Sequence, residues 1–455
     1  MDAMQGILNA VSEVFWYAWW LWVPLLLFPL FESTWLFWRQ QVFKHELEFV
    51  HMEIRIPREV TKSPRAMEQV LMTVHNLRNA PADPEEKWWD GEVTRWYALE
   101  IVSFGGEIHL YVRAWRKQKE IIQAAFFANY PDVEIVETDD YIDRLPASVG
   151  EMYKSGYDLW GSEFILEREP AYPIRSYMDF ESPDEEKQFD PMSTFLEVLG
   201  KVKREEMLCI QYLIRPASMK WRDKYQPLVE ALRTRHQKIG GAGGAKPTIG
   251  MEFPHILPTF PVKQSGGDED ALRVIGRAIM TRTPGETDVL KAVEENLSLP
   301  PFETLIRFVY LSPKELYFDT LPRRGLRGAF NQYAAADLNW FERNERISTR
   351  VKIWDFPFFF PHARLDCRKS RVLADYRARE IPPETSVGKI IRSKFLHWEH
   401  SRMFLLSVRS LATLFHPPTY QVLTAPHIKR VESRKTGAPA GLAIYGGEEE
   451  MEKFK

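Results

Sequence analysis

The sequence predicts an α+β protein, and three observations support this prediction. An uncharged apolar run from Phe15 to Phe31 predicts an N-terminal transmembrane helix. Residues 47–145 then show strands and helices in the order β-α-β-β-α-β, and a similar order recurs over residues 155–335. We therefore expect a membrane anchor, two βαββαβ-type domains, and a helical, irregular C-terminal region.

The anchor and a juxtamembrane helix are expected over residues 1–46. About 20 apolar residues span the hydrocarbon core of a bilayer, and tryptophan is enriched at both of its interfaces. Helices in lipid also tolerate proline, here Pro24 and Pro29. The alternatives are a buried core helix and an interfacial helix. The residues expected to contact the membrane are Phe15, Trp16, Trp19, Trp20, Trp22, Leu25, Phe28 and Trp35.

The charges on either side of the run predict its orientation. Asp2 and Glu13 precede it without any Lys or Arg, whereas Arg39 and Lys44 follow it. Positive residues favour the cytoplasmic side, so we expect a single-pass protein of the inner membrane with a cytoplasmic C-terminal body. The absence of a basic segment before the run disfavours a cleaved signal peptide.

Composition excludes some classes of protein. The 455 residues are 45% hydrophobic and 27% charged, which is ordinary for a globular protein. A net charge of −3 disfavours a general nucleic-acid binder. Cys209 and Cys367 are the only cysteines, so a disulfide framework and a four-thiolate zinc site are both excluded.

Local signals predict the first unit in some detail. Alternation from Phe49 to Ile56 predicts a half-buried strand, and Ser63 before Pro64 predicts the start of a helix. Gly105-Gly106 between two alternating runs predicts a hairpin. A helix and a short strand over residues 117–136 complete the order. This is the split pattern of a ferredoxin-like domain, here over residues 47–145, and we expect residues 47–140 to fold alone.

The second unit is expected to be an elaborated ferredoxin-like domain over residues 155–335. The glycine-rich segment GGAGGAKPTIG lies in an insertion, residues 237–270, whose composition is typical of a flexible linker. Strands are predicted at 163–167, 207–215 and 302–311, and helices at 191–198, 220–235, 287–296 and within 315–333.

Regularity decreases after residue 335, and residues 336–455 are expected to form a docking region. Apolar residues at helical spacing predict a helix over Met403–Phe415. The phenylalanine-rich segment Trp354–Asp366 predicts a loop that covers the core, with a partner or membrane contact as the alternative.

No pattern in the sequence predicts catalysis, and we expect no catalytic residue, cofactor or metal. The run Gly244-Ala245-Lys246-Pro247 lacks the spacing of a phosphate-binding loop, and Pro247 removes an amide donor. His397 and His400 share a helix face, yet two ligands do not make a metal site. A metal-dependent hydrolase is the enzymatic alternative.

Two basic segments are candidates for contact with a partner or with nucleic acid. Either one supplies cations for phosphates, and single-stranded nucleic-acid binding is the second alternative. A solvated face or a set of internal salt bridges is the favoured explanation of both segments. The residues are Arg323, Arg324, Arg327, Lys429, Arg430, Arg434 and Lys435.

The segment Leu405–Gly446 resembles the region that leads into the motor domain of HerA-like and TraG/TraD-like ATPases of bacterial type IV secretion. Leu411–Pro417, Ile428-Lys429 and Ser433–Lys435 carry the resemblance, and His51–Glu59 after the anchor adds to it. No Walker motif is present in the sequence, so motor activity does not transfer. The resemblance implies a membrane-anchored scaffold or accessory subunit that docks a separate motor ATPase. Nucleic acid and a second copy of the chain are further candidate partners.

Overall fold

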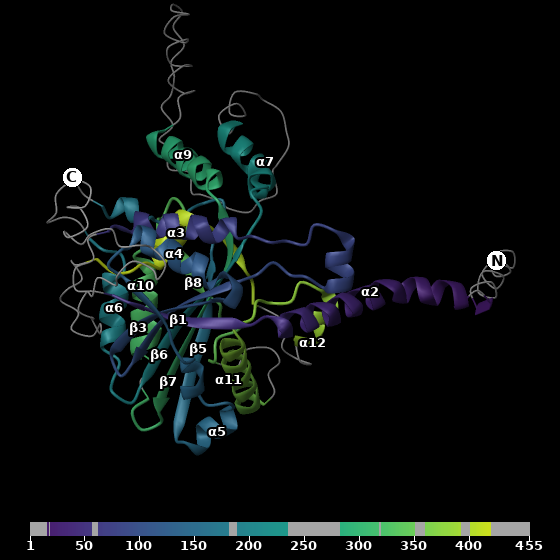
Figure 1. Cartoon of the computed structure of the whole chain (residues 1–455), viewed down its shortest axis with the longest axis horizontal. Helices are drawn as coiled ribbons and strands as arrows, with labels where there is room; N and C mark the ends of the chain where they lie inside the picture. Colours follow the sequence, from purple (N-terminus) through teal and green to yellow (C-terminus); the bar gives the residue numbers. More distant parts are fainter. Residues whose placement is uncertain are drawn as a thin grey trace, which may run out of the picture.

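The computed structural model describes residues 16–17, 19–56, 62–181, 189–234, 283–317, 320–350, 360–392 and 401–419. Within these ranges the chain is α+β, as expected, with helices packed on a nine-stranded antiparallel sheet (Figure 1). The strand order along the sheet is β4-β1-β3-β2-β6-β7-β5-β8, and β9 pairs with β7 beside this path.

The first half of the sheet has the predicted β-α-β-β-α-β order. Ser63 caps the first helix by accepting a hydrogen bond from Arg65 N, and Gly105 and Gly106 adopt positive φ in the hairpin turn. The neighbours in the sheet follow the order β4-β1-β3-β2. The elements are β1 (Phe49–Arg55), α3 (Pro64–Asn76), β2 (Tyr97–Phe104), β3 (Glu107–Trp115), α4 (Lys119–Asn129) and β4 (Glu134–Glu137).

The second half repeats this arrangement around its own four strands. Its strands lie side by side in the order β8-β5-β7-β6. When the strands of each half are numbered from 1 to 4 along the chain, both halves have the order 4-1-3-2. The first strand starts earlier than the predicted residue 163. The elements are β5 (Tyr157–Leu166), α6 (Ser193–Gly200), β6 (Met207–Pro216), α7 (Trp221–Thr234), α9 (Pro284–Ser298), β7 (Pro301–Pro313), η6 (Leu321–Gly325), α10 (Leu326–Asn331) and β8 (Phe341–Arg343).

The two halves form one sheet, joined where β2 pairs with β6. All eight residues of β2 take part, and Glu100 lies opposite Gln211. A pseudo-twofold axis between these two residues relates β1 to β5, β2 to β6 and β3 to β7. The sequence predicted two separate domains and did not predict this shared sheet.

One face of the sheet carries the largest apolar core, which includes residues of α3, α4, α6 and α10. The C-terminal part of the chain completes this core. Phe404–Ser407 form strand β9, paired with the start of β7, and Val408–Leu414 form helix α13, packed on α3. The predicted helix over Met403–Phe415 is therefore half strand. Leu411 and Phe415 are fully buried, so they belong to the core.

The opposite face carries a polar row that crosses six strands. Its members are successive partners in the sheet, in the order Glu53, Tyr111, Glu100, Gln211, Arg307 and Glu163. Apolar clusters flank the row along the strands, with Val102 and Cys209 on one side and Ala98 and Leu213 on the other. Helix α11 (Pro361–Ala378), which the sequence did not predict, and α5 (Val149–Lys154) pack against this face.

Helix α2 (Trp19–Glu46) projects from the body and carries the chain's described N-terminal end far from the sheet (Figure 1). Among the helices that the structure describes, none, α2 included, combines the length and the apolar character that crossing a bilayer requires. The expectation of a transmembrane helix is therefore not supported.

Candidate functional site

The inner half of α2 is fixed to the body by η1 (Glu86–Asp90). The indole Nε1 of Trp35 donates a hydrogen bond to Trp88 O over 2.8 Å, and Arg39 Nε donates to Trp89 O. Gly91 closes η1 with φ +69°, and a Cβ at this position would lie 2.4 Å from the Arg39 carbonyl carbon. The backbone after η1 therefore lies directly against α2.

Helix α12 (Ser386–Arg392) holds α2 from the other side. Val387 N donates a hydrogen bond of 3.0 Å to Ser33 Oγ, and a Cβ on Gly388 would lie 2.7 Å from the ring of Phe37. Two residues along a helix correspond to a rotation of about 200°. Ser33 and Phe37 thus lie opposite Trp35 and Arg39, and the inner half of α2 is clamped between α12 and η1.

The polar row fixes the segment that carries α12. Arg379, which ends α11 with φ +51°, donates to both carboxylate oxygens of Glu100 over 2.7 and 2.8 Å, and also to Asp140. Burial alone would raise the pKa of Glu100, but the charge and hydrogen bonds of Arg379 outweigh it and lower that pKa. Glu100 is therefore held ionised beneath the C-terminal segment.

A second buried pair anchors the same segment. Arg307 Nε donates to Glu163 over 2.8 Å, and its Nη1 donates to the carbonyls of Asp375 and Glu380. Burial outweighs the attraction of Arg307 and raises the pKa of Glu163. Further on, Glu384 pairs with Arg215 of β6, close to the start of α12. Through these contacts the sheet holds the segment that precedes α12, and α12 in turn holds the inner half of α2. We call this held part of α2 and its neighbours α12 and η1 the base.

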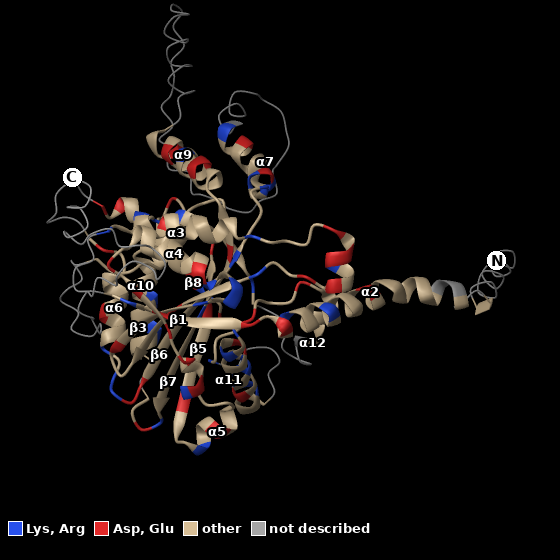
Figure 2. Cartoon of the chain, viewed as in Figure 1, with Lys and Arg blue, Asp and Glu red and all other residues tan. Residues whose placement is uncertain are grey.

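Beyond this base, α2 forms an apolar arm, which we define as residues 20–31. Leu25 and Phe28 are 74% and 63% exposed, and their neighbours Leu26, Leu27, Leu30 and Phe31 are exposed as well. The exposed residues are consecutive, so they surround the helix instead of forming a stripe. Figure 2 draws no charged residue on this outer part of α2.

The predicted membrane-contact residues differ in how exposed they are. Trp16 and Trp20 are exposed with Leu25 and Phe28, whereas Trp35 is half-buried in the base. Trp19 and Trp22 belong to α2, but their side chains lie outside the described residues, as does Phe15.

Four exposed apolar side chains lie around the base: Trp38, Trp89, Ile390 and Ile391. Sequence reasoning missed the last three. Trp38 lies on α2, Trp89 on η1, and the two isoleucines on α12. The available signal was a pair of apolar residues inside a polar segment, EKWWD and GKIIR. Two adjacent apolar residues match neither the helical period of about 3.6 nor the strand period of about 2. They therefore did not predict that η1 and α12 expose apolar side chains beside α2.

The basic residues predicted as contacts are only partly described. Arg323 and Arg324 lie on η6, and Arg327 on α10 pairs with Glu342 over 3.2 Å, as the salt-bridge interpretation expects. The second basic group, Lys429, Arg430, Arg434 and Lys435, lies outside the described residues. So do His397, Glu399, His400 and the glycine-rich segment.

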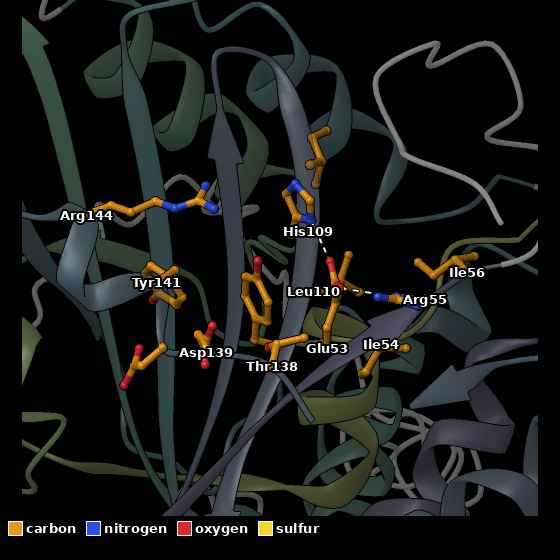
Figure 3. A pocket seen from close by; sticks show the side chains of 13 residues that line it. Glu53, Ile54, Arg55, Ile56, His109, Leu110, Thr138, Asp139, Tyr141 and Arg144 are labelled. Carbon is orange, nitrogen blue, oxygen red and sulfur yellow. Dashed lines mark hydrogen bonds and ion pairs between the residues drawn. The ribbon is translucent and has the colours of Figure 1, made fainter. Parts of the chain in front are cut away.

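A cavity of about 490 Å³ opens where the polar row reaches β1 and β3 (Figure 3). The imidazole of His109 lies 2.6 Å from Glu53, and this hydrogen bond is the main cause that lowers the pKa of Glu53. Tyr141 stacks on Tyr111 at 5.2 Å and covers the aromatic surface that a nucleic-acid base would need. Within the described ranges, no group of three or more His, Cys, Asp or Glu residues is placed to hold a metal ion.

Comparison with known proteins identifies the family. The family model described as Domain of unknown function (DUF8128) matches residues 39–342, which include seven of the nine strands in full and the start of the eighth, together with the inner end of α2. A search of curated proteins finds no match. Since the family model covers well over half of the chain, this protein belongs to the family of the domain of unknown function DUF8128.

Proposed function

We propose that this protein is a non-enzymatic scaffold held on a lipid bilayer by the apolar arm. The observation that supports the proposal is a helix that is apolar on all sides and rigidly clamped at its base. Such a helix belongs in a large core or in a membrane. The arm projects away from the chain's own core, so a membrane is the environment that suits it.

A bilayer explains the arm better than a binding groove does. A helix that docks in a groove presents one stripe of anchors at positions i, i+3, i+4 and i+7. Leu25, Leu26, Leu27 and Phe28 instead point in four directions. Burying side chains of this size contributes about 1.5–3 kcal/mol each. Lipid solvates every face, so all of them contribute.

The length of the arm sets how deeply it enters. At 1.5 Å per residue, residues 20–31 extend about 18 Å, so they reach into the ~30 Å hydrocarbon core. We propose that the arm inserts into the membrane and holds the body at its surface.

The body is suited to a platform role. Each half of the sheet has the strand connections and neighbour order of a ferredoxin-like unit, and we propose two such units joined edge to edge through β2 and β6. The continuous sheet joins the two halves into one body.

We further propose that this platform docks a separate motor ATPase in a type IV secretion apparatus. This part rests on the resemblance of Leu411–Pro417 and Ser433–Lys435. Because Leu411–Phe415 are buried, docking would use the residues that follow, including Lys429 and Arg430.

The test introduces charge into the arm. The double variant Leu25→Asp and Phe28→Asp should lose at least tenfold in affinity for vesicles of phosphatidylethanolamine and phosphatidylglycerol, measured by flotation, since burying a carboxylate in lipid costs several kcal/mol. Both positions are exposed, so stability in urea should not change.

The matched control places the same charges elsewhere. Ile121 and Phe127 on α4 are 45% and 43% exposed, and Ile121→Asp with Phe127→Asp should leave vesicle binding unchanged. Absence of binding by the wild-type protein, or equal binding by the arm variant, would reject the proposal.

A further inference from the structure

We propose that the membrane-bound protein is tilted, so that α12 lies in the lipid headgroup region while η1 faces water. The inference rests on the proposed function, because a second membrane contact presupposes the first. It follows from the side chains that α12 and η1 expose on the two sides of α2. α12 and η1 hold opposite faces of α2, next to the start of the arm.

The α12 side suits an interface between lipid and water. Ile391 is 56% exposed and Ile390 is 66% exposed, and Lys389 beside them is exposed too. The helix sequence SVGKIIR contains no acidic residue. Short helices that combine exposed aliphatic residues with Lys or Arg are typical of contacts with anionic bilayers.

The η1 side opposes such contact. Asp83, Glu85 and Asp90 are exposed around Lys87, and Figure 2 shows acidic residues gathered here beside α2. Carboxylates are repelled by anionic headgroups. Trp89 is the one large apolar side chain exposed on η1, and an indole favours the membrane interface, but the carboxylates around it oppose an approach to anionic headgroups. The charge difference therefore favours α12 as the second contact.

Because α12 is held against both α2 and the sheet, membrane contact by α12 would orient the whole body. α12 cannot move independently of the arm, because Gly388 lies against Phe37 and Val387 is bonded to Ser33. α12 is also tied to the sheet through the ion pair of Glu384 with Arg215. When the arm inserts, one side of its base must approach the membrane. The α12 side presents Glu384, which is paired with Arg215, whereas the η1 side presents Asp83, Glu85 and Asp90.

The experiment uses nitroxide labels on the full chain. Cys367 is exposed and is first replaced by Ser, while the buried Cys209 stays. Single cysteines are then introduced as Leu25→Cys, Ile391→Cys and Glu85→Cys. Collision of each label with a water-soluble nickel chelate is measured with and without vesicles of phosphatidylethanolamine and phosphatidylglycerol. Vesicles should protect the labels at positions 25 and 391 several-fold and leave the label at position 85 accessible.

The outcomes separate the two proposals. Protection at position 25 without protection at 391 overturns the tilt and leaves the arm's membrane role intact. Protection at both 391 and 85 shows upright insertion and also overturns the tilt. No protection at position 25 rejects the proposed function itself.

A second measurement examines affinity. Ile391→Asp should weaken vesicle binding several-fold, whereas Met219→Asp, at a position of similar exposure outside α12 and η1, should not. Equal effects of the two substitutions would contradict a specific contact by α12.

Discussion

Glu100 lies at the centre of the sheet, fully buried beneath Arg379, and it connects the strands to the segment that carries α12. Replacing it by Gln leaves the Arg379 guanidinium with only the partly exposed Asp140 as an ionic partner. Removing one partner of a buried pair typically costs about 3–5 kcal/mol. We therefore predict a loss of this size for Glu100→Gln, measured by urea unfolding.

An exposed pair provides the control. Glu197 and Lys201 are spaced i,i+4 on the surface, and such pairs contribute about 0.3–0.5 kcal/mol. Glu197→Gln should therefore change little. A small effect of Glu100→Gln would show that the buried pair does not hold the C-terminal segment.

The two ends of the polar row should respond to pH in opposite directions. The pKa of Glu53 is lowered, chiefly by His109, so its contribution to stability is present above the unfolded value of 4.5 and is lost as pH falls through the folded pKa. The pKa of Glu163 is raised by burial, so its contribution is present below 4.5 and is lost as pH rises.

His109→Phe tests the first of these effects. It removes the hydrogen bond that lowers the pKa of Glu53, so the variant should lose less stability than the wild type between about pH 5 and about pH 3. The check is a series of urea titrations across that range. Parallel stability curves for the two proteins would contradict it.

At the scale of elements, the contact between η1 and α2 depends on one glycine. Gly91→Ala adds a methyl group 2.4–2.7 Å from Arg39 atoms at a positive φ, so η1 must separate from α2. Left-handed backbone alone costs an Ala about 1–2 kcal/mol, and the clash adds to it. We expect faster hydrogen exchange at the Trp35 indole and lower stability.

Gly156 is a matched control for that substitution. It has a similar φ of +77°, but no atom lies within 4 Å of its ideal Cβ. Gly156→Ala should therefore show the backbone cost only and leave the Trp35 indole protected. Equal behaviour of the two variants would mean that η1 does not depend on close approach.

The elements that the sequence predicted correctly have local signals. Ser63 before Pro64 marks α3, and Gly105-Gly106 marks the hairpin, because caps and turns depend on adjacent residues. Helix α11 was missed because Arg364 and Lys369 lie on its buried side, where Asp158 pairs with Lys369. Buried charges remove the apolar period on which helix prediction relies.

The strand β9 and the polar row were missed for different reasons. A short apolar run such as Phe404–Ser407 has no period that separates strand from helix. The row depends on the registers of six strands, which pair across the whole chain. For the same reason, the apolar run of the arm could be predicted from the sequence, whereas its contacts with α12 and η1 could not.

At the scale of the whole molecule, the shared sheet affects the expectation that residues 47–140 fold alone. That fragment would expose the β2 edge that pairs with β6 and would lose the packing of α13 on α3. We predict that the fragment unfolds at lower urea than the full chain and self-associates through β2, an unpaired edge. Sedimentation and urea titration would measure both properties. A monomeric fragment as stable as the full chain would contradict the prediction.

The central claim is that the apolar arm inserts in a bilayer while the sheet stays at the surface. Amide hydrogen exchange of the full chain, with and without vesicles of phosphatidylethanolamine and phosphatidylglycerol, tests it most directly. Addition of vesicles should slow exchange in residues 20–31, since lipid excludes water from their backbone, and should leave β2, β6 and β7 unchanged. Unchanged exchange in residues 20–31 under conditions where the protein floats with the vesicles would contradict the account.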